Sequence, residues 1–151
     1  MEHRFGQSHP LSLGVEEEIM ILDGETLMPA PQVATLVEGT AEAALPGLLK
    51  TELHASVVEL NTAVASNGLE VLASVQALRA AAEEVARENG LRIAAAGSHP
   101  LAHAEDLVIV QEQRYLDFVE YAGVSAIRPW VMVLIHIPQS PIKRLCGRRC
   151  R

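Results

Sequence analysis

One run of residues gives the clearest indication of the fold: Leu13-Gly-Val-Glu-Glu-Glu-Ile-Met-Ile21. Apart from its acids the run resembles a buried strand, in which successive side chains point to opposite faces of a sheet. The residues that share the apolar face are Leu13, Val15, Ile19 and Ile21. The same alternation places Glu16 and Glu18 together on the other face, so the run predicts a strand with two carboxylates on one side.

Two like charges on neighbouring positions of one face repel and are costly to desolvate, and a cation relieves both costs. Hard divalent ions such as Mg²⁺ prefer carboxylate oxygens. The alternative interpretation is a half-exposed strand whose polar face meets water. Glu17 interrupts the apolar face, and we expect it at an edge or in contact with solvent.

Composition limits the class of protein. The chain has 151 residues and is 49% hydrophobic, which predicts one globular domain with a sizeable core. Its net charge of -7 disfavours a nucleic acid or an anionic membrane as the main partner and is compatible with metal-bound anionic substrates. No apolar run is long enough to span a bilayer and no signal peptide is evident, so a cytoplasmic protein is expected.

Several kinds of site are not supported by the sequence. The two cysteines, Cys146 and Cys150, both lie in the last six residues, so neither a disulfide framework nor a four-ligand zinc site is expected. Neither of the glycine-rich phosphate loops, GxxxxGK[ST] and GxGxxG, occurs. A GxSxG elbow for a nucleophilic serine is also absent, which disfavours a hydrolase.

Local signals then divide the chain into elements. The turn at Asp23-Gly24 predicts a hairpin that returns as a short strand over Thr26 to Met28. Residues Gln32 to Glu38 resemble a short helix closed by Gly39. Ser56 to Thr62 has the β-branched content of a strand.

The clearest helix is expected from Leu69 to Asn89, capped by Ser66 or Asn67 and ended by Gly90. Its predicted apolar stripe, which should pack on a sheet, consists of Leu72, Val75, Leu78, Ala82 and Val85.

The chain then continues with a buried strand over Leu91 to Ala96 and a loop at Gly97 to Pro100. A second helix is expected over Gln111 to Ala122, ended by Gly123, and a further strand could begin within Val124 to Ile127. The side chains expected to point inward from this helix are Tyr115, Phe118, Val119 and Ala122. The fold class is therefore α+β, with a mainly antiparallel sheet covered on one face by the helices at 69–89 and 111–122.

A second acidic group contains Glu52 and Glu59, seven residues apart. Since seven is odd, the two carboxylates can converge only if a bulge or turn near His54 to Ser56 interrupts the strand. Both could instead be ordinary surface acids. Glu59 is harder to explain in that way, because it lies between apolar residues of the strand.

Together these segments resemble the carboxylate-amine ligases of the glutamate-cysteine ligase type 2 family. The matching stretches, in the family's order, are Leu13-Gly-Val-Glu-Glu-Glu-Ile, Glu52 through Val-Glu59-Leu-Asn-Thr, the helix leading into Gly97-Ser-His-Pro100, and Arg114-Tyr115.

The resemblance implies a glutamine-synthetase-like catalytic sheet and an ATP-dependent ligase of glutathione-type thiol biosynthesis. In that family ATP phosphorylates the side-chain carboxylate of glutamate, and the amine of cysteine, or of another acceptor, attacks the acyl phosphate. Mg²⁺ would balance the phosphate charge. The residues that the resemblance suggests as Mg²⁺ ligands are Glu16, Glu18, Glu52 and Glu59.

Arg114 is suggested by the same resemblance as a group that holds a substrate carboxylate or phosphate, because a guanidinium can bind two oxygens at once. Alternatively it is a surface arginine paired with Glu112 or Asp117. His99 could bond a ligand from its loop or serve a structural role. No catalytic residue is assigned.

The family pattern is lost near the end of the chain. Its Gly-x-His-x-His strand is expected where the sequence has Trp130-Val-Met-Val-Leu-Ile-His-Ile137, and a shifted reading frame would account for the difference. We therefore expect residues 1–130 to be the N-terminal part of a ligase domain and 131–151 an aberrant basic tail. An incomplete sheet would favour association, possible homo-oligomers included, and little or no activity. The alternatives are a non-catalytic remnant that binds a partner through its open edge, and a metal-binding module without nucleotide.

Overall fold

The computed structural model describes residues 9–123 and 133–136. Its strands are β1 (Gly14–Asp23), β2 (Gly47–Thr51), β3 (Val57–Thr62), β4 (Leu91–Ala94) and β5 (Val133–His136). Its helices are α1 (Val33–Thr40), α2 (Gly68–Glu88), the short 3₁₀ helix η1 (Ala104–Asp106) and α3 (Gln113–Ala122). All the strands pair in one antiparallel sheet, which confirms the predicted α+β class.

Strand β1 is central in this sheet. The order is β2-β3-β1-β4, and β5 also pairs with β1. Strand β3 pairs with β1 over Glu16 to Met20, while β5 pairs with its beginning and β4 with its end. Because Glu16 and Glu17 pair with both β3 and β5, and Met20 with both β3 and β4, strands β4 and β5 lie along the same edge of β1. The predicted edge position of Glu17 is therefore wrong.

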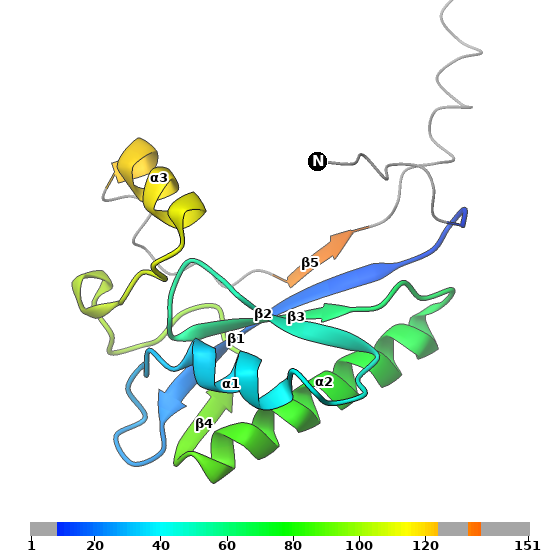
Figure 1. Cartoon of the computed structure of the whole chain (residues 1–151), viewed down its shortest axis with the longest axis horizontal. Helices are drawn as coiled ribbons and strands as arrows, with labels where there is room; N and C mark the ends of the chain where they lie inside the picture. Colours follow the sequence, from blue (N-terminus) through cyan, green and yellow to red (C-terminus); the bar gives the residue numbers. More distant parts are fainter. Residues whose placement is uncertain (1–8, 124–132, 137–151) are drawn as a thin grey trace, which may run out of the picture.

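Helices α1 and α2 cover one face of the sheet, as Figure 1 shows. Alternate residues of β1 and β3 point toward them, and each fully buried aliphatic side chain contributes about 1.5–3 kcal/mol to folding. The buried core consists of Ile19, Ile21, Ala30, Val33, Leu36, Leu49, Val58, Leu60, Leu78 and Ala82. The packing of α2 on a sheet is thereby confirmed.

Helix α1 continues one residue past Gly39, which was expected to lie just beyond its end. A Cβ atom at position 39 would lie 2.7 Å from Cγ1 of Val85 in α2. The glycine therefore permits the two helices to approach closely and does not end the helix.

Helix α2 begins and ends as the sequence indicates. The Asn67 side chain accepts hydrogen bonds from the backbone N–H groups of Leu69 and Glu70, and Gly90 adopts a positive φ of 69°. The apolar stripe differs from the prediction, because Leu72 is 53% exposed. Its buried residues are Ser74, Leu78, Ala82 and Ala86.

The predicted strand at Thr26 to Met28 is reduced to a turn and a single bridge between Leu22 and Pro29. Asp23 explains the turn, since its carboxylate accepts bonds from the backbone N–H groups of Glu25 and Thr26. Leu27 adopts a left-handed φ of 59°, which interrupts an extended conformation.

Helix α3 does not share the sheet face with α2, contrary to the prediction. Figure 1 shows it to one side of the sheet, near the end of β2. Tyr115 is buried, but Phe118 is 49% exposed and does not point inward. Gly123 follows the helix as expected, with a φ of 65°.

The last part of the chain is described only in β5, which lies in the segment predicted to depart from the family pattern and pairs with β1. The predicted strand at 124–127 lies outside the described residues. None of the helices within residues 9–123 and 133–136 has the length and apolarity needed to cross a membrane.

Candidate metal centre

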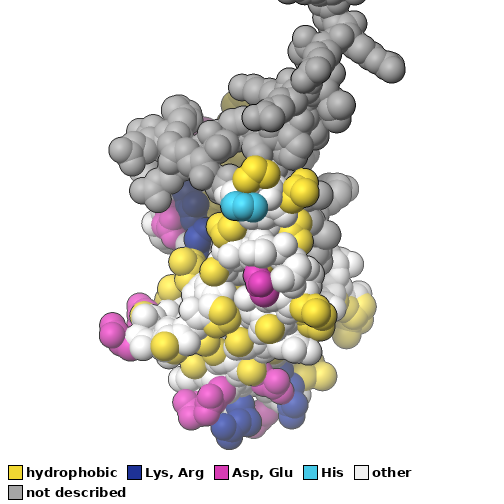
Figure 2. All heavy atoms as spheres, turned by 90° about the vertical axis from the view of Figure 1, so that its right-hand side faces the viewer, with side chains coloured by type: hydrophobic (Ala, Val, Ile, Leu, Met, Phe, Trp, Pro, Cys, Tyr) yellow, Lys and Arg dark blue, Asp and Glu magenta, His cyan; other side chains and the backbone are white. Residues whose placement is uncertain are grey.

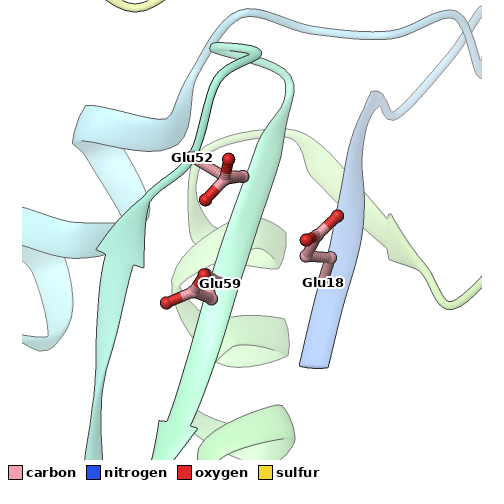
Figure 3. Close-up of side chains that lie close together, drawn as sticks. All are labelled: Glu18, Glu52 and Glu59. Carbon is pink, nitrogen blue, oxygen red and sulfur yellow. The ribbon is translucent and has the colours of Figure 1, made fainter. Parts of the chain in front are cut away.

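Three carboxylates meet on the sheet face opposite α1 and α2. Glu18 of β1 lies directly across from Glu59 of β3 in the antiparallel register, and Glu52 follows the end of β2. One oxygen atom of each carboxylate lies within 4.8 Å of an oxygen of both others. Figure 3 shows the three side chains around a common space. We call these three residues the carboxylate cluster.

The connection between β2 and β3 explains how Glu52 reaches the cluster. Thr51 pairs with Val58 in the ladder, and residues 52–56 form the turn between the strands. This turn is the interruption that the seven-residue spacing requires, so the predicted break near His54 to Ser56 is confirmed.

The electrostatics of the cluster favour a cation. Burial raises the pKa of the Glu52 carboxyl, and the neighbouring Glu59 raises it further, while the Leu53 backbone and Arg114 act in the opposite direction. The side chain of Glu59 is 15% exposed. A divalent cation would neutralise the repulsion that otherwise favours protonation of Glu52.

Two residues that the sequence analysis missed lie beside Glu59. The Asn61 amide donates a hydrogen bond to Glu59 Oε1, and Lys50 Nζ lies 3.8 Å from the same oxygen. Lys50 Nζ also donates to Asn61 Oδ1 over 2.7 Å. Alternation along β3 could have placed Asn61 on the face of Glu59, whereas Lys50 reaches it through the pairing of β2 with β3, for which the sequence has no local signal.

Glu16 is on the same face as Glu18 but two residues earlier in β1, opposite Asn61. Within the part of the chain that the structure describes, it does not belong to the group of three acids. The structure therefore brings together three of the four glutamates suggested as ligands.

Glu17 points to the helix face and not to solvent. Its side chain is 8% exposed and forms an ion pair with the guanidinium of Arg79 in α2, in which Arg79 Nε donates to Glu17 Oε2 over 2.8 Å. The fork of two N–H groups satisfies both carboxylate oxygens. Glu17 thus connects β1 to α2, and the expected solvent contact is wrong.

Arg114 lies near the cluster and already has protein partners. Its Nε donates to Glu112 Oε2 over 3.0 Å, and its Nη2 donates to the Tyr115 hydroxyl over 2.6 Å. This is the predicted alternative pairing with Glu112, whereas Asp117 bonds Gln113. The Arg114 side chain is 60% exposed, which leaves room for a ligand oxygen beside its guanidinium.

His99 has a structural role in its loop. Nδ1 accepts hydrogen bonds from the backbone N–H groups of Leu101 and Ala102, so Nε2 carries the proton and donates to the carbonyl of Leu27 over 2.9 Å. Both ring nitrogens are used within the protein.

The donor set of the cluster fits a hard divalent cation. It contains only carboxylate oxygens, which Mg²⁺ and Ca²⁺ prefer, whereas zinc sites usually include thiolate or imidazole ligands. Three carboxylates from three different segments also leave positions for water or for phosphate oxygens, which is the usual arrangement for Mg²⁺.

Comparisons with known proteins identify the family of the chain. The sequence model of Glutamate-cysteine ligase family 2 (GCS2) matches residues 12–133. A protein of Rubrobacter xylanophilus named "Putative glutamate-cysteine ligase 2-3" is 37% identical over 128 residues, which cover 83% of this chain and 35% of that protein. A "Glutamate-cysteine ligase" of Halobacterium salinarum is 35% identical over 113 residues, 73% of this chain and 31% of its own length.

The chain spans about a third of the length of these curated relatives. The matched residues contain β1, β2, β3 and α2, and thus all three members of the carboxylate cluster. The chain belongs to the glutamate-cysteine ligase family 2.

Proposed function

We propose that this chain supplies the divalent-cation site of an ATP-dependent ligase that joins the side-chain carboxylate of glutamate to an amine. The observation that carries the proposal is the convergence of Glu18, Glu52 and Glu59 on the sheet face opposite α1 and α2. Mg²⁺ is the proposed ion and ATP the proposed co-substrate, since magnesium in phosphoryl-transfer sites is held by a few carboxylates together with substrate phosphates.

In the proposed reaction the glutamate side-chain carboxylate attacks the terminal phosphorus of ATP and releases ADP. The amine of cysteine, or of another acceptor, then attacks the carbonyl carbon, and phosphate leaves as the amide forms. The bound cation would supply neutralisation of the phosphate oxygens. The three glutamates would hold it, while the exposed guanidinium of Arg114 would orient a substrate carboxylate or phosphate by two parallel hydrogen bonds.

Titration calorimetry with Mg²⁺ in the presence and absence of an ATP analogue tests the proposal. We expect metal-dependent nucleotide binding that Glu18→Ala weakens at least tenfold, because one of three charged ligands is lost. Glu84→Ala, which removes an exposed acid of α2, is the matched control and should have no effect. The Mg²⁺ affinity of Glu16→Ala shows whether Glu16, which lies outside the carboxylate cluster, contributes to binding of the ion. Equal affinities for the wild type and Glu18→Ala would contradict the proposal.

The whole enzyme is proposed to act in the cytoplasm, in glutathione-type thiol biosynthesis, where ATP and reduced thiols are available. Because the chain corresponds to about a third of its relatives' length, we expect the 151-residue protein alone to have little or no ligase activity. ATP turnover by the purified chain that depends on both glutamate and cysteine would refute this expectation.

One observation favours a second candidate, a non-catalytic interaction module. Among the described strands, β2 lies at the end of the pairing order and offers a free backbone edge. Large apolar side chains, among them Val64, Leu69 and Leu72, are also more than half exposed. Figure 2, which looks onto one end of the molecule, shows apolar side chains spread among polar ones and charged side chains gathered at the lower edge.

Sedimentation analysis distinguishes this candidate from the ligase. The interaction module predicts concentration-dependent association that is independent of Mg²⁺ and nucleotide and that Leu48→Lys weakens, because this variant places a charge at a half-exposed position of the edge strand. The ligase predicts metal-dependent nucleotide binding whether or not the chain associates. A monomer that binds Mg²⁺ and nucleotide would reject the interaction module.

A further inference from the structure

Glu52 differs from the other two members of the carboxylate cluster in how its backbone is held. Glu18 and Glu59 lie within strands, where ladder hydrogen bonds fix the direction of each side chain. Glu52 comes one residue after the end of β2 and has no strand pairing. A carboxylate at a strand end needs other contacts if it is to stay aimed at an ion.

Such contacts come from the segment that leads into α3. The Val110 N–H donates to the Leu53 carbonyl over 3.0 Å, and the Ala55 N–H donates to the Val108 carbonyl over 2.8 Å. The backbone that follows Glu52 is thereby bonded to a segment more than 50 residues away in the sequence.

The residue before Glu52 is held from the same side by two side chains. The Tyr115 hydroxyl donates to the Thr51 carbonyl over 2.9 Å, and Thr51 Oγ1 donates to Glu112 Oε1 over 2.6 Å. Tyr115 is only 8% exposed, so its bond is shielded from water. Arg114 Nη2 donates to the Tyr115 hydroxyl, which fixes the direction of the hydroxyl proton toward Thr51.

We propose that Tyr115 and Glu112 are positioning residues for the metal site, holding Thr51 so that the Glu52 carboxylate faces Glu18 and Glu59. This inference rests on the proposed function. It gives the start of α3 a second role beside substrate binding by Arg114, namely holding the backbone next to Glu52. Neither residue touches the ion in this proposal; both act through the backbone at Thr51.

Binding of Mn²⁺ to the 151-residue chain, followed by the electron paramagnetic resonance signal of the free ion, tests the inference directly. We expect Tyr115→Phe, which removes only the hydroxyl, to raise the Mn²⁺ dissociation constant roughly three- to tenfold, as loss of one shielded hydrogen bond would. Tyr121→Phe is the matched control, because that hydroxyl is on the same helix but its residue is 93% exposed. Its dissociation constant should equal that of the wild type.

A second pair of variants separates positioning from general stability. Thr51→Val removes the bond to Glu112 and should weaken Mn²⁺ binding, whereas Thr51→Ser retains the hydroxyl and should restore the affinity. Asn67→Ala removes the cap of α2 far along the chain and should lower the melting temperature without changing the Mn²⁺ dissociation constant at temperatures where the protein is folded.

The outcomes separate the two proposals. A wild-type chain that binds no Mn²⁺ would overturn the proposed metal site and this inference with it. Wild-type binding that Glu18→Ala abolishes but Tyr115→Phe and Thr51→Val leave unchanged would overturn the positioning role alone.

Discussion

Two adjacent residues of β1, Glu17 and Glu18, show how differently the two faces of the sheet use the same side chain. Glu17 points toward α2, where its carboxylate is enclosed and paired with Arg79. Glu18 points to the opposite face, where it meets two further carboxylates. The helix-covered face neutralises its acid within the protein, whereas the opposite face brings acids together.

The difference indicates that β1 pairs its acid within the protein on the helix-covered face and gathers acids around Glu18 on the other, although Met20 and Leu22 farther along that second face are also buried. On the helix-covered face, aliphatic residues such as Ile19 and Ile21 are fully buried. At the carboxylate cluster, like charges are kept close at a cost in free energy, which is typical of functional sites. Variants on the helix-covered face should therefore change stability directly, whereas variants of Glu18 and Glu52 should change how stability responds to a cation or to pH.

The largest change in stability is expected from the helix-covered face. Leu78→Ala removes a fully buried side chain between α2 and the sheet and should lower the free energy of unfolding by about 3 kcal/mol. Leu72→Ala, at an exposed position of the same helix, should change it by less than about 0.5 kcal/mol. Urea denaturation measures both. Equal effects would show that α2 packs by the stripe predicted from the sequence.

Substitution of the two members of the ion pair between β1 and α2, Glu17 and Arg79, should lower the free energy of unfolding by different amounts. Arg79→Gln leaves the buried Glu17 carboxylate unpaired and should cost about 2 kcal/mol, discounted from the value for a fully buried pair because Arg79 is half exposed. Glu17→Gln should cost about 1 kcal/mol, since the amide oxygen still accepts a bond and the guanidinium can reach water. Urea denaturation that ranked the two variants in reverse would place the buried charge on Arg79.

A cation bound at the carboxylate cluster should stabilise the protein. Mg²⁺ at ten times its dissociation constant should raise the free energy of unfolding by about 1.4 kcal/mol, because the ion binds only the folded chain. Glu18→Gln should reduce this increase to about 0.4 kcal/mol or less, since a tenfold weaker site is only half filled at the same Mg²⁺ concentration, and NaCl of equal ionic strength should not reproduce it. Thermal denaturation with and without Mg²⁺ provides the measurement; an increase that Glu18→Gln leaves at its full size would mean that the ion binds elsewhere.

The smallest effect is a pH dependence of the metal-free protein. Because burial raises the pKa of Glu52 above its ordinary value of 4.5, the folded chain binds more protons than the unfolded chain just above that pH. The free energy of unfolding should therefore decrease as pH rises from 4.5, and Glu52→Gln should remove that part of the decrease. Glu84→Gln should retain it. Denaturation in EDTA across this range is the measurement, and identical pH profiles for the wild type and Glu52→Gln would contradict it.

Much of the architecture could be predicted from local signals. The alternation in β1, the β-branched run of β3 and the periodicity of α2 act over a few residues, as do the caps at Asn67 and Gly90, so each could be recognised in isolation. Strand β2 has no such pattern. Its strand conformation is imposed by pairing with β3.

The predicted end of α1 and the predicted position of α3 were wrong because contacts between distant segments determine both. Gly39 is a usual helix terminator, yet the side chain of Val85 in another helix determines its role. The position of α3 beside β2, and not over the sheet, depends on bonds from Tyr115 to Thr51. Neither contact has a signature within one segment.

The sequence by itself determined that acids would alternate with aliphatic residues along β1, because the period of a strand is a local property of the backbone. It also determined the family, through spaced motifs that recur in order. Only the tertiary structure decided which acids meet. Glu17 pairs with Arg79 on the other face of the sheet, and Glu16 lies outside the carboxylate cluster. A turn brings Glu52 to Glu18 and Glu59. Convergence depends on strand register and on side chains from distant elements, and neither is encoded within a single run of residues.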